Sequence, residues 1–123
     1  PSLVRRIVAI QSAIESGWKV RLCFDPILVY SGWENDYSEL IEHIKSEING
    51  NKIFDITVGV FRMGHDYFQR VRKSKPVSNV YYQNYENEDG VMTESGFNRK
   101  SVESFMRKKL SDYILESKIH FWV

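Results

Sequence analysis

The segment at residues 19–27 constrains the fold of this chain more than any other. Apolar and polar side chains alternate along it: Val20, Leu22 and Phe24 against Arg21, Cys23 and Asp25. This period of two predicts a β-strand, which ends at Asp25-Pro26 because proline has no amide donor and favours an extended residue before it. Helical patterns on both sides indicate an α/β sheet. Ligands bind beyond the carboxyl ends of such strands, so Asp25, Pro26 and Ile27 are candidate site residues.

A second strand follows after one helix. The apolar stripe Tyr37, Leu40, Ile41, Ile44 and Ile48 predicts a helix that begins at Asn35 or Asp36. Residues 52–63 then form a strand with apolar residues on both faces, which is typical of a buried parallel strand. Arg62 falls at its carboxyl end, beside the expected position of Asp25. Two interpretations stay open: a salt bridge between Asp25 and Arg62 at the sheet edge, or a pair of ligand contacts.

The remaining elements are read from caps, turns and periodicity. A first helix runs from Leu3 to Ile14 with Ser2 as its N-cap and Gly17 as its stop. A short helix begins near Gly64, and strand-like residues 79–85 and 91–93 flank an Asp-Gly turn, which is a strong hairpin signal. A last helix and a terminal strand at 118–123 complete a single domain, 1–123. The aromatic loop after the first strand, with Tyr30 and Trp33, is either a ligand cover or a plug for the core.

Composition excludes several classes of function. The formal net charge is +1, so any case for nucleic acid depends on local clusters. Cys23 is the only cysteine, which excludes an internal disulfide and a cysteine-rich metal or iron–sulfur site within this chain. A lone cysteine on a strand suits a reducing cytoplasm, and no apolar run approaches the ~20 residues that span a bilayer.

The densest group of cations, called the basic segment below, comprises Arg70, Arg72, Lys73 and Lys75. Cations at a helix C-terminus are favoured by the helix dipole alone. Together with Tyr82, Arg99 and Lys100 they also suit a surface that stacks on bases and pairs with phosphates. Residue chemistry by itself stops at an α/β domain with these two candidate sites.

A collinear series of segments resembles the C-terminal half of the spore photoproduct lyases. No single motif is diagnostic, and the series covers nearly the whole chain: Pro1 to Arg6, Val20 to Ile27, Gly32-Trp33-Glu34, Tyr37 to Leu40, Asp55-Ile56-Thr57, Phe61-Arg62, Gln69 to Pro76 and Lys118 to Phe121.

The resemblance implies part of a radical S-adenosylmethionine enzyme that repairs a thymine dimer in DNA. In that family a partial (β/α) barrel carries a C-terminal hairpin that holds DNA, and a [4Fe–4S] cluster cleaves the cofactor to a radical. The cluster cysteines lie in the N-terminal half of the family and Cys23 matches none of them, so this chain is expected to be inactive alone. By resemblance, Asp25, Pro26, Ile27 and Arg62 face S-adenosylmethionine, and Lys73, Lys75, Tyr82, Arg99 and Lys100 face DNA. The expected partner is the N-terminal half of the same protein, and an exposed strand edge favours self-association.

The hairpin departs from the family pattern. It carries Glu86, Glu88, Asp89 and Glu94 where the family is rich in Lys, Arg, Tyr and Gly. Acidic residues repel phosphates, so two alternatives stay open: a radical enzyme with a non-DNA substrate, and a free-standing α/β module that binds nucleic acid or protein.

Overall fold

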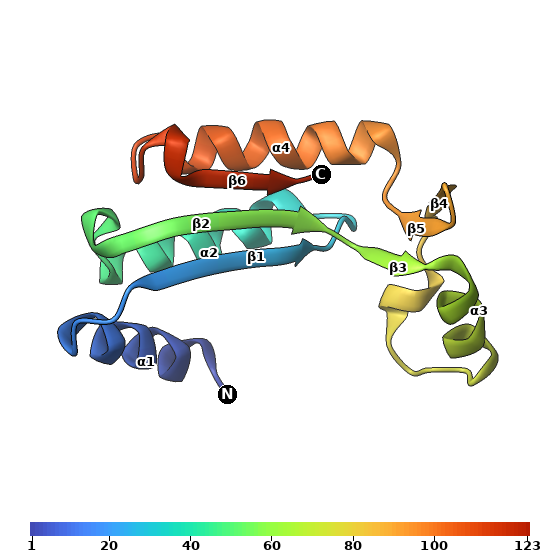
Figure 1. Cartoon of the computed structure of the whole chain (residues 1–123), viewed down its shortest axis with the longest axis horizontal. Coiled ribbons are helices and arrows are strands. Elements are labelled where there is room, and N and C mark those ends of the chain that lie inside the picture. The colour runs from blue at the N-terminus through green and yellow to red at the C-terminus, as the bar shows by residue number, and fades with distance from the viewer.

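The computed structural model describes all residues 1–123, which form two small sheets and four α-helices (Figure 1). In chain order the elements are α1 (Leu3–Glu15), β1 (Val20–Ile27), α2 (Trp33–Glu47), the 3-10 turn η1 (Gly50–Lys52), β2 (Ile53–Val60), β3 (Arg62–Gly64), α3 (His65–Lys73), the 3-10 turn η2 (Asn79–Tyr82), β4 (Glu86–Glu88), β5 (Val91–Thr93), α4 (Gly96–Leu110), the 3-10 turn η3 (Glu116–Lys118) and β6 (Ile119–Trp122).

The larger sheet is parallel and has the order β1-β2-β6. Leu22 pairs with Ile56, and Ile56 pairs in turn with Ile119, so the apolar side chains of the three strands form rows on one face. α2 lies behind these strands and α4 runs alongside β6 (Figure 1), and both helices bury apolar side chains in the same core. The predicted α/β architecture with parallel strands is therefore confirmed.

The predicted helix ends agree with the structure at α1 and differ at α2. Ser2 Oγ accepts a hydrogen bond from the amide of Arg5, and Gly17 takes the left-handed backbone expected after a helix. α2 begins at Trp33, before the predicted Asn35 or Asp36, and follows Gly32 at φ 91°. Trp33 is buried with its ring centroid 4.9 Å from that of Phe105. Trp33 is thus a plug of the core, whereas Tyr30 is exposed.

The predicted strand over 52–63 is wrong at its end. β2 ends at Val60, and β3 starts at Arg62 in a second, antiparallel sheet of order β3-β5-β4. The chain turns there because Phe61 leaves the main core and stacks on Tyr85, with 4.3 Å between the ring centroids. This second aromatic cluster, which also contains Phe68, positions the hairpin beyond the carboxyl end of β2.

The predicted strand over 79–85 is also wrong, although the hairpin itself is confirmed. Residues 79–82 form η2, which is capped by Ser78. Tyr85 packs in the aromatic cluster and does not pair with a neighbouring strand. The hairpin is β4 paired with β5, so Glu86 and Glu88 lie in a strand. Its turn has positive φ at Asp89 and Gly90, as expected for an Asp-Gly hairpin.

Candidate functional site

One face of the parallel sheet carries polar side chains and has no apolar core against it. Because the strands are in register, alternate residues meet on this open face: Arg21, Cys23 and Asp25 from β1, Asp55, Thr57 and Gly59 from β2, and His120 and Trp122 from β6. Leu22, Phe24, Ile56 and Val58 point the other way and are buried in the core. The open face is where side chains of the three strands can meet a ligand.

At the carboxyl ends of the strands, Arg62 joins all three. Its Nη2 lies 2.9 Å from Asp25 Oδ2, and its Nη1 donates hydrogen bonds to the carbonyl oxygens of Val60 (2.8 Å) and Trp122 (3.0 Å). The structure therefore brings together the two charged residues predicted for this site. Of the two interpretations left open by the sequence, it shows the salt bridge between Asp25 and Arg62. The side chains of Arg62 and Asp25 are 42% and 28% exposed, so both also face solvent.

Gly59 lies directly beneath this ion pair. A Cβ atom at Gly59 would lie 2.6 Å from Asp25 Oδ1 and 2.7 Å from Arg62 Nη1, closer than real contacts allow. The two charged side chains occupy the space that a side chain at residue 59 would need, so a larger residue there would displace the end of at least one of them. Reasoning from the sequence missed this residue. A glycine inside a strand of apolar residues signals the close approach of another group and could have revealed it.

The two other predicted cofactor residues differ in accessibility. Pro26 is exposed and follows Asp25 through a cis peptide bond. Ile27 is fully buried in the core, so only its backbone can meet a ligand at this end of the sheet.

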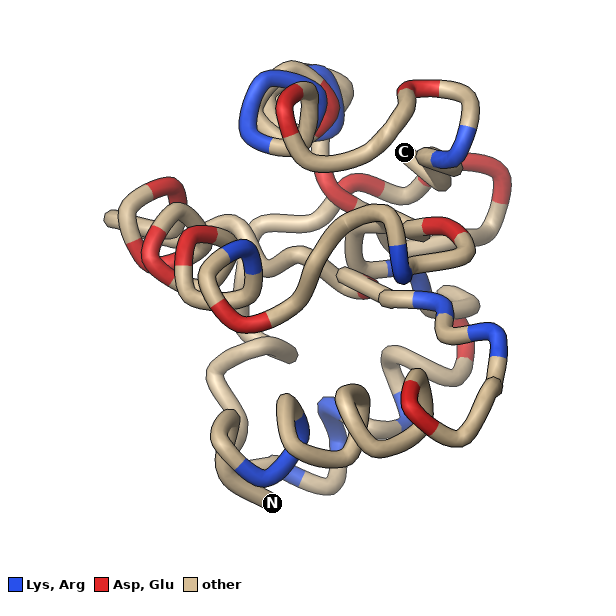
Figure 2. Tube along the Cα trace, turned by 90° about the vertical axis from the view of Figure 1, so that its left-hand side faces the viewer, with Lys and Arg blue, Asp and Glu red and all other residues tan.

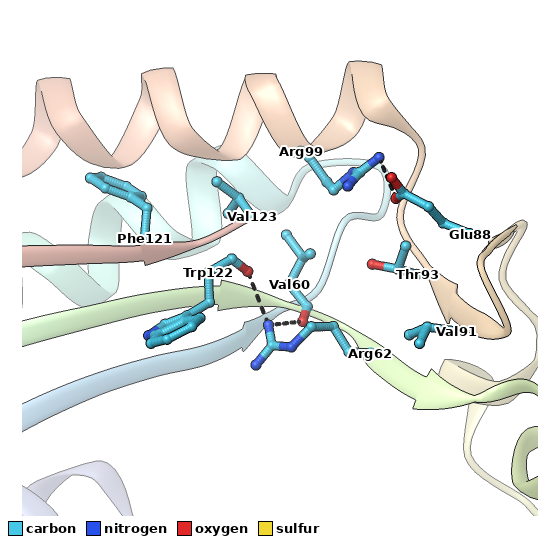
Figure 3. A pocket seen from close by; sticks show the side chains of 9 residues that line it. All are labelled: Val60, Arg62, Glu88, Val91, Thr93, Arg99, Phe121, Trp122 and Val123. Carbon is cyan, nitrogen blue, oxygen red and sulfur yellow. Dashed lines mark hydrogen bonds and ion pairs between the residues drawn. The ribbon is translucent and has the colours of Figure 1, made fainter.

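A cavity of about 300 Å³ lies between the ends of β2 and β6 and the hairpin (Figure 3). Arg62 and Arg99 both line it, with the apolar side chains of Val60 and Phe121. Arg99 was predicted to face DNA, yet it points toward the hairpin and pairs with Glu88 at 2.7 Å. Its Nε is buried without a hydrogen-bond partner. Arg99 thus belongs to the surroundings of this cavity and is less accessible than the other predicted DNA residues.

The basic segment lies at the C-terminal end of α3 and is exposed. None of its four cations forms an ion pair, and neither does Lys100. Arg72 lies 5.8 Å from the centroid of the Tyr82 ring, and the hydroxyl of Tyr82 donates to the carbonyl oxygen of Pro76 at 2.9 Å. Lys73, Lys75 and Tyr82 therefore form a surface of unpaired cations next to a fixed aromatic ring.

A buried carboxylate at the other end of the open face was not anticipated from the sequence. Asp55 is 4% exposed, and its oxygens lie 2.5 Å from Arg21 Nε and 3.3 Å from His120 Nε2. Both partners are exposed on neighbouring strands. An aspartate within an apolar strand was the available signal, since buried carboxylates need partners.

The structure reveals two general absences. No group of three or more His, Cys, Asp and Glu side chains is arranged to hold a metal ion. None of the helices has the length and apolar character needed to cross a membrane.

Replacing Gly59 by alanine tests the close packing under the ion pair. We expect Gly59→Ala to lower the free energy of unfolding by up to about 1 kcal/mol, the value of a partly exposed ion pair that the new methyl group displaces, as measured by chemical denaturation. Gly64→Ala is the matched control, because nothing lies within 4 Å of a Cβ at Gly64. In an Asp25→Ala background the cost of Gly59→Ala should shrink, since one of the displaced groups is absent. Equal costs in both backgrounds would contradict this account.

Glu94, between the hairpin and α4, predicts a pH dependence of stability. Burial raises the pKa of Glu94, partly offset by the hydrogen bond that Asn98 Nδ2 donates to it at 2.9 Å. A carboxyl with a raised pKa in the fold stabilises the protein below its unfolded pKa, and this contribution is lost as pH rises through the folded pKa. Glu94→Gln, which keeps the acceptor for Asn98, should therefore raise the melting temperature at pH 7 and change it little near pH 4. The exposed Glu86→Gln serves as control, and a gain for Glu94→Gln that is the same at both pH values would exclude the titration of Glu94 as its cause.

Comparisons with known proteins place the fold. The spore photoproduct lyase family model matches residues 1–121, whereas a search of curated protein sequences finds no match. Similar solved structures are a spore photoproduct lyase complexed with dinucleoside spore photoproduct (TM-score 0.74, 18% identity), a double mutant with bound AdoMet and dinucleoside spore photoproduct (0.71, 19%) and a point mutant (0.73, 18%).

Each of these alignments covers 98% of this chain but 38% of the solved relative. The likeness confirms the predicted fold class, part of a partial (β/α) barrel with a hairpin, a helix and a terminal strand. Together with the family match over nearly its whole length, it shows that this chain belongs to the spore photoproduct lyase family.

Proposed function

We propose that this chain is the C-terminal, substrate- and DNA-facing portion of a spore photoproduct lyase-like radical S-adenosylmethionine enzyme that reverses thymine dimers. The family match over residues 1–121 carries the proposal, and the solved relatives are longer, with 38% of their length covered by the chain. The reaction requires an N-terminal half that supplies the cluster, and this chain is inactive alone.

The residues of this chain do not fit an iron–sulfur cluster. Such clusters are held mostly by cysteine thiolates, and the chain has one cysteine, Cys23, and no group of three or more His, Cys, Asp and Glu side chains that could hold a metal ion. No step through the cluster is therefore assigned to these residues.

The carboxyl end of the sheet does fit part of S-adenosylmethionine. Asp25 and Arg62 offer an acceptor and a donor on the open face, where both side chains fit above Gly59 and Arg62 is held by the carbonyl oxygens of Val60 and Trp122. A carboxylate suits ribose hydroxyls and an ammonium group, whereas a guanidinium suits a carboxylate. Asp25, Arg62, exposed Pro26 and the backbone of Ile27 would hold the cofactor, which supplies the radical chemistry when bound with the cluster.

The free side of β1 suits the N-terminal half as a neighbour. β1 pairs with β2 alone, so its other edge has unpaired backbone groups. A hollow of about 250 Å³ beside it is lined by Leu3, Ile7, Ile10 and Leu22, among other apolar residues. Val4 and Val8 of α1 are also exposed. An adjoining strand and its helix would pair with this edge and cover the apolar side chains.

For the isolated chain, the same edge predicts self-association. We expect the average mass in sedimentation velocity to rise with protein concentration, because an open strand edge beside apolar side chains favours pairing with another copy. Leu3→Glu should reduce this rise by charging the hollow, whereas Leu115→Glu, at an exposed leucine outside it, should not. Strictly monomeric behaviour at high concentration would argue against an available edge.

The distribution of charge supports a DNA contact at α3 rather than at α2. Acidic residues gather along α2 in Figure 2, with Lys45 as the single basic residue of that helix. The basic segment is unpaired, as is Lys100 on α4. The acidic hairpin is less repulsive than its sequence indicates, because Glu88 is paired with Arg99 and Glu94 is buried. Glu86 and Asp89 are its remaining exposed acids next to a DNA backbone.

A salt titration tests the DNA contact. We expect binding of this chain to lesion-bearing duplex DNA to weaken with salt, with a slope of log K against log salt of about −0.9 per phosphate contact. Lys73→Ala combined with Lys75→Ala should make that slope less steep by roughly 1.8. Lys52→Ala, an exposed lysine of η1, should leave it unchanged.

A flat salt response would count against DNA as the partner. It would instead favour the second candidate, a radical enzyme of the same type with a non-DNA substrate, for which the exposed Glu86 and Asp89 of the hairpin argue.

A further inference from the structure

A second cavity, of about 400 Å³, lies between the loop that follows β1 and the segment around η2. Its size falls within the range of small-molecule pockets, about 300–1,000 Å³. Eight residues line it: Leu28, Val29 and Tyr30 from the loop, and Ser78, Asn79, Val80, Gln83 and Tyr85 from the η2 segment. This cavity is distinct from the one beside Arg62, because no residue lines both.

No charged side chain lines this cavity, in contrast to the one that holds Arg62, Arg99 and Glu88. A phosphate, carboxylate or ammonium group would lose its hydration there without gaining a countercharge. The apolar walls of Leu28, Val29 and Val80 instead favour a neutral ligand with apolar faces.

Polar groups lie along the η2 side of the cavity and are free to bind. The side chain of Asn79 makes no hydrogen bond within the chain, and Gln83 donates from Nε2 to the carbonyl oxygen of Asn79 at 3.3 Å, which leaves its Oε1 free. The two tyrosines are held by their hydroxyls, since Tyr30 donates to Asp36 and Tyr85 to the carbonyl oxygen of Val80, each at 2.7 Å. The cavity thus combines the exposed ring of Tyr30 with free amide groups, whereas the ring of Tyr85 is already stacked on Phe61 through one face.

A nucleobase has this combination of flat apolar faces and a polar edge. Side-chain amides of Asn and Gln pair best with adenine, which offers an adjacent donor and acceptor, and aromatic rings stack on any base. The basic segment ends at Lys75, just before Ser78 of the cavity, so phosphates next to a bound base would meet unpaired cations.

We propose that the cavity lined by Asn79 and Gln83 binds a single unpaired nucleobase, with adenine preferred, while the basic segment contacts the neighbouring phosphates. This inference rests on the proposed function, because it takes DNA as the partner. The proposed function is thereby extended by a neutral subsite that recognises one base, and this subsite does not include the proposed cofactor residues Asp25 and Arg62.

The test compares single-stranded oligonucleotides that differ at one central position, which is adenine, thymine or an abasic site. Binding to the chain is measured by fluorescence anisotropy at low and high salt. We expect Asn79→Leu to weaken binding of the adenine oligonucleotide about tenfold, the loss typical of one good base contact, and to leave the abasic oligonucleotide unchanged. The factor should be the same at both salt concentrations, because the substitution removes no charge. Asn84→Leu, an exposed asparagine of the same segment outside the cavity, is the matched control, and circular dichroism checks that both variants fold.

Separate results decide the cavity and the DNA interface. Salt-dependent binding that is equal for adenine and abasic oligonucleotides, or unaffected by Asn79→Leu, would overturn the base pocket and leave the DNA interface standing. Free deoxyadenosine, titrated while the NMR signals of Tyr30 and Gln83 are followed, tests the pocket without phosphates. If deoxyadenosine shifts these signals while no oligonucleotide binds, the base pocket stands and the proposed DNA function fails. If neither probe binds, both are overturned.

Discussion

The arrangement of this chain depends on the guanidinium of Arg62, which contacts the carboxyl ends of all three parallel strands. It pairs with Asp25 of β1 and donates to backbone carbonyls at the ends of β2 and β6. Arg62 is also the first residue of β3, so the same side chain fixes the point where the chain leaves one sheet and enters the other. The glycine beneath it leaves room for the ion pair, since a side chain there would displace the carboxylate or the guanidinium.

The two faces of the parallel sheet differ in character, one apolar and buried and the other polar. One face packs on α2 and α4 and provides stability through buried aliphatic side chains, while the open face carries Asp25, Asp55 and His120. Stability thus depends little on the identity of open-face residues that meet no neighbour. Cys23, which is exposed and makes no hydrogen bond or ion pair, can therefore change at small cost to the core, whereas Arg21 is needed as a partner of the buried Asp55.

The two cavities at this end of the molecule differ in chemistry although they are built on neighbouring elements. The cavity beside Arg62 contains charged groups, and that beside η2 is neutral with free amides. The aromatic cluster of Phe61, Phe68 and Tyr85 lies at the base of the hairpin region and holds the chain in the shape that forms them. A protein that binds a charged cofactor and a nucleobase would need such a division, because each ligand is desolvated against a different set of groups.

The sequence by itself determined the features that depend on local patterns. The alternation in β1, the cap at Ser2 and the Asp-Gly turn are set by the geometry of a few adjacent residues, and each is found in the structure. The pairing of Asp25 with Arg62 could be anticipated as well, because carboxyl ends of parallel strands meet at one edge. Only the tertiary structure decided that Phe61 and Tyr85 stack, that Arg99 turns inward to Glu88, and that Gly59 lies directly against the ion pair of Asp25 and Arg62. These features depend on contacts between residues far apart in the chain, and packing between them overrides the local strand pattern at residues 79–85.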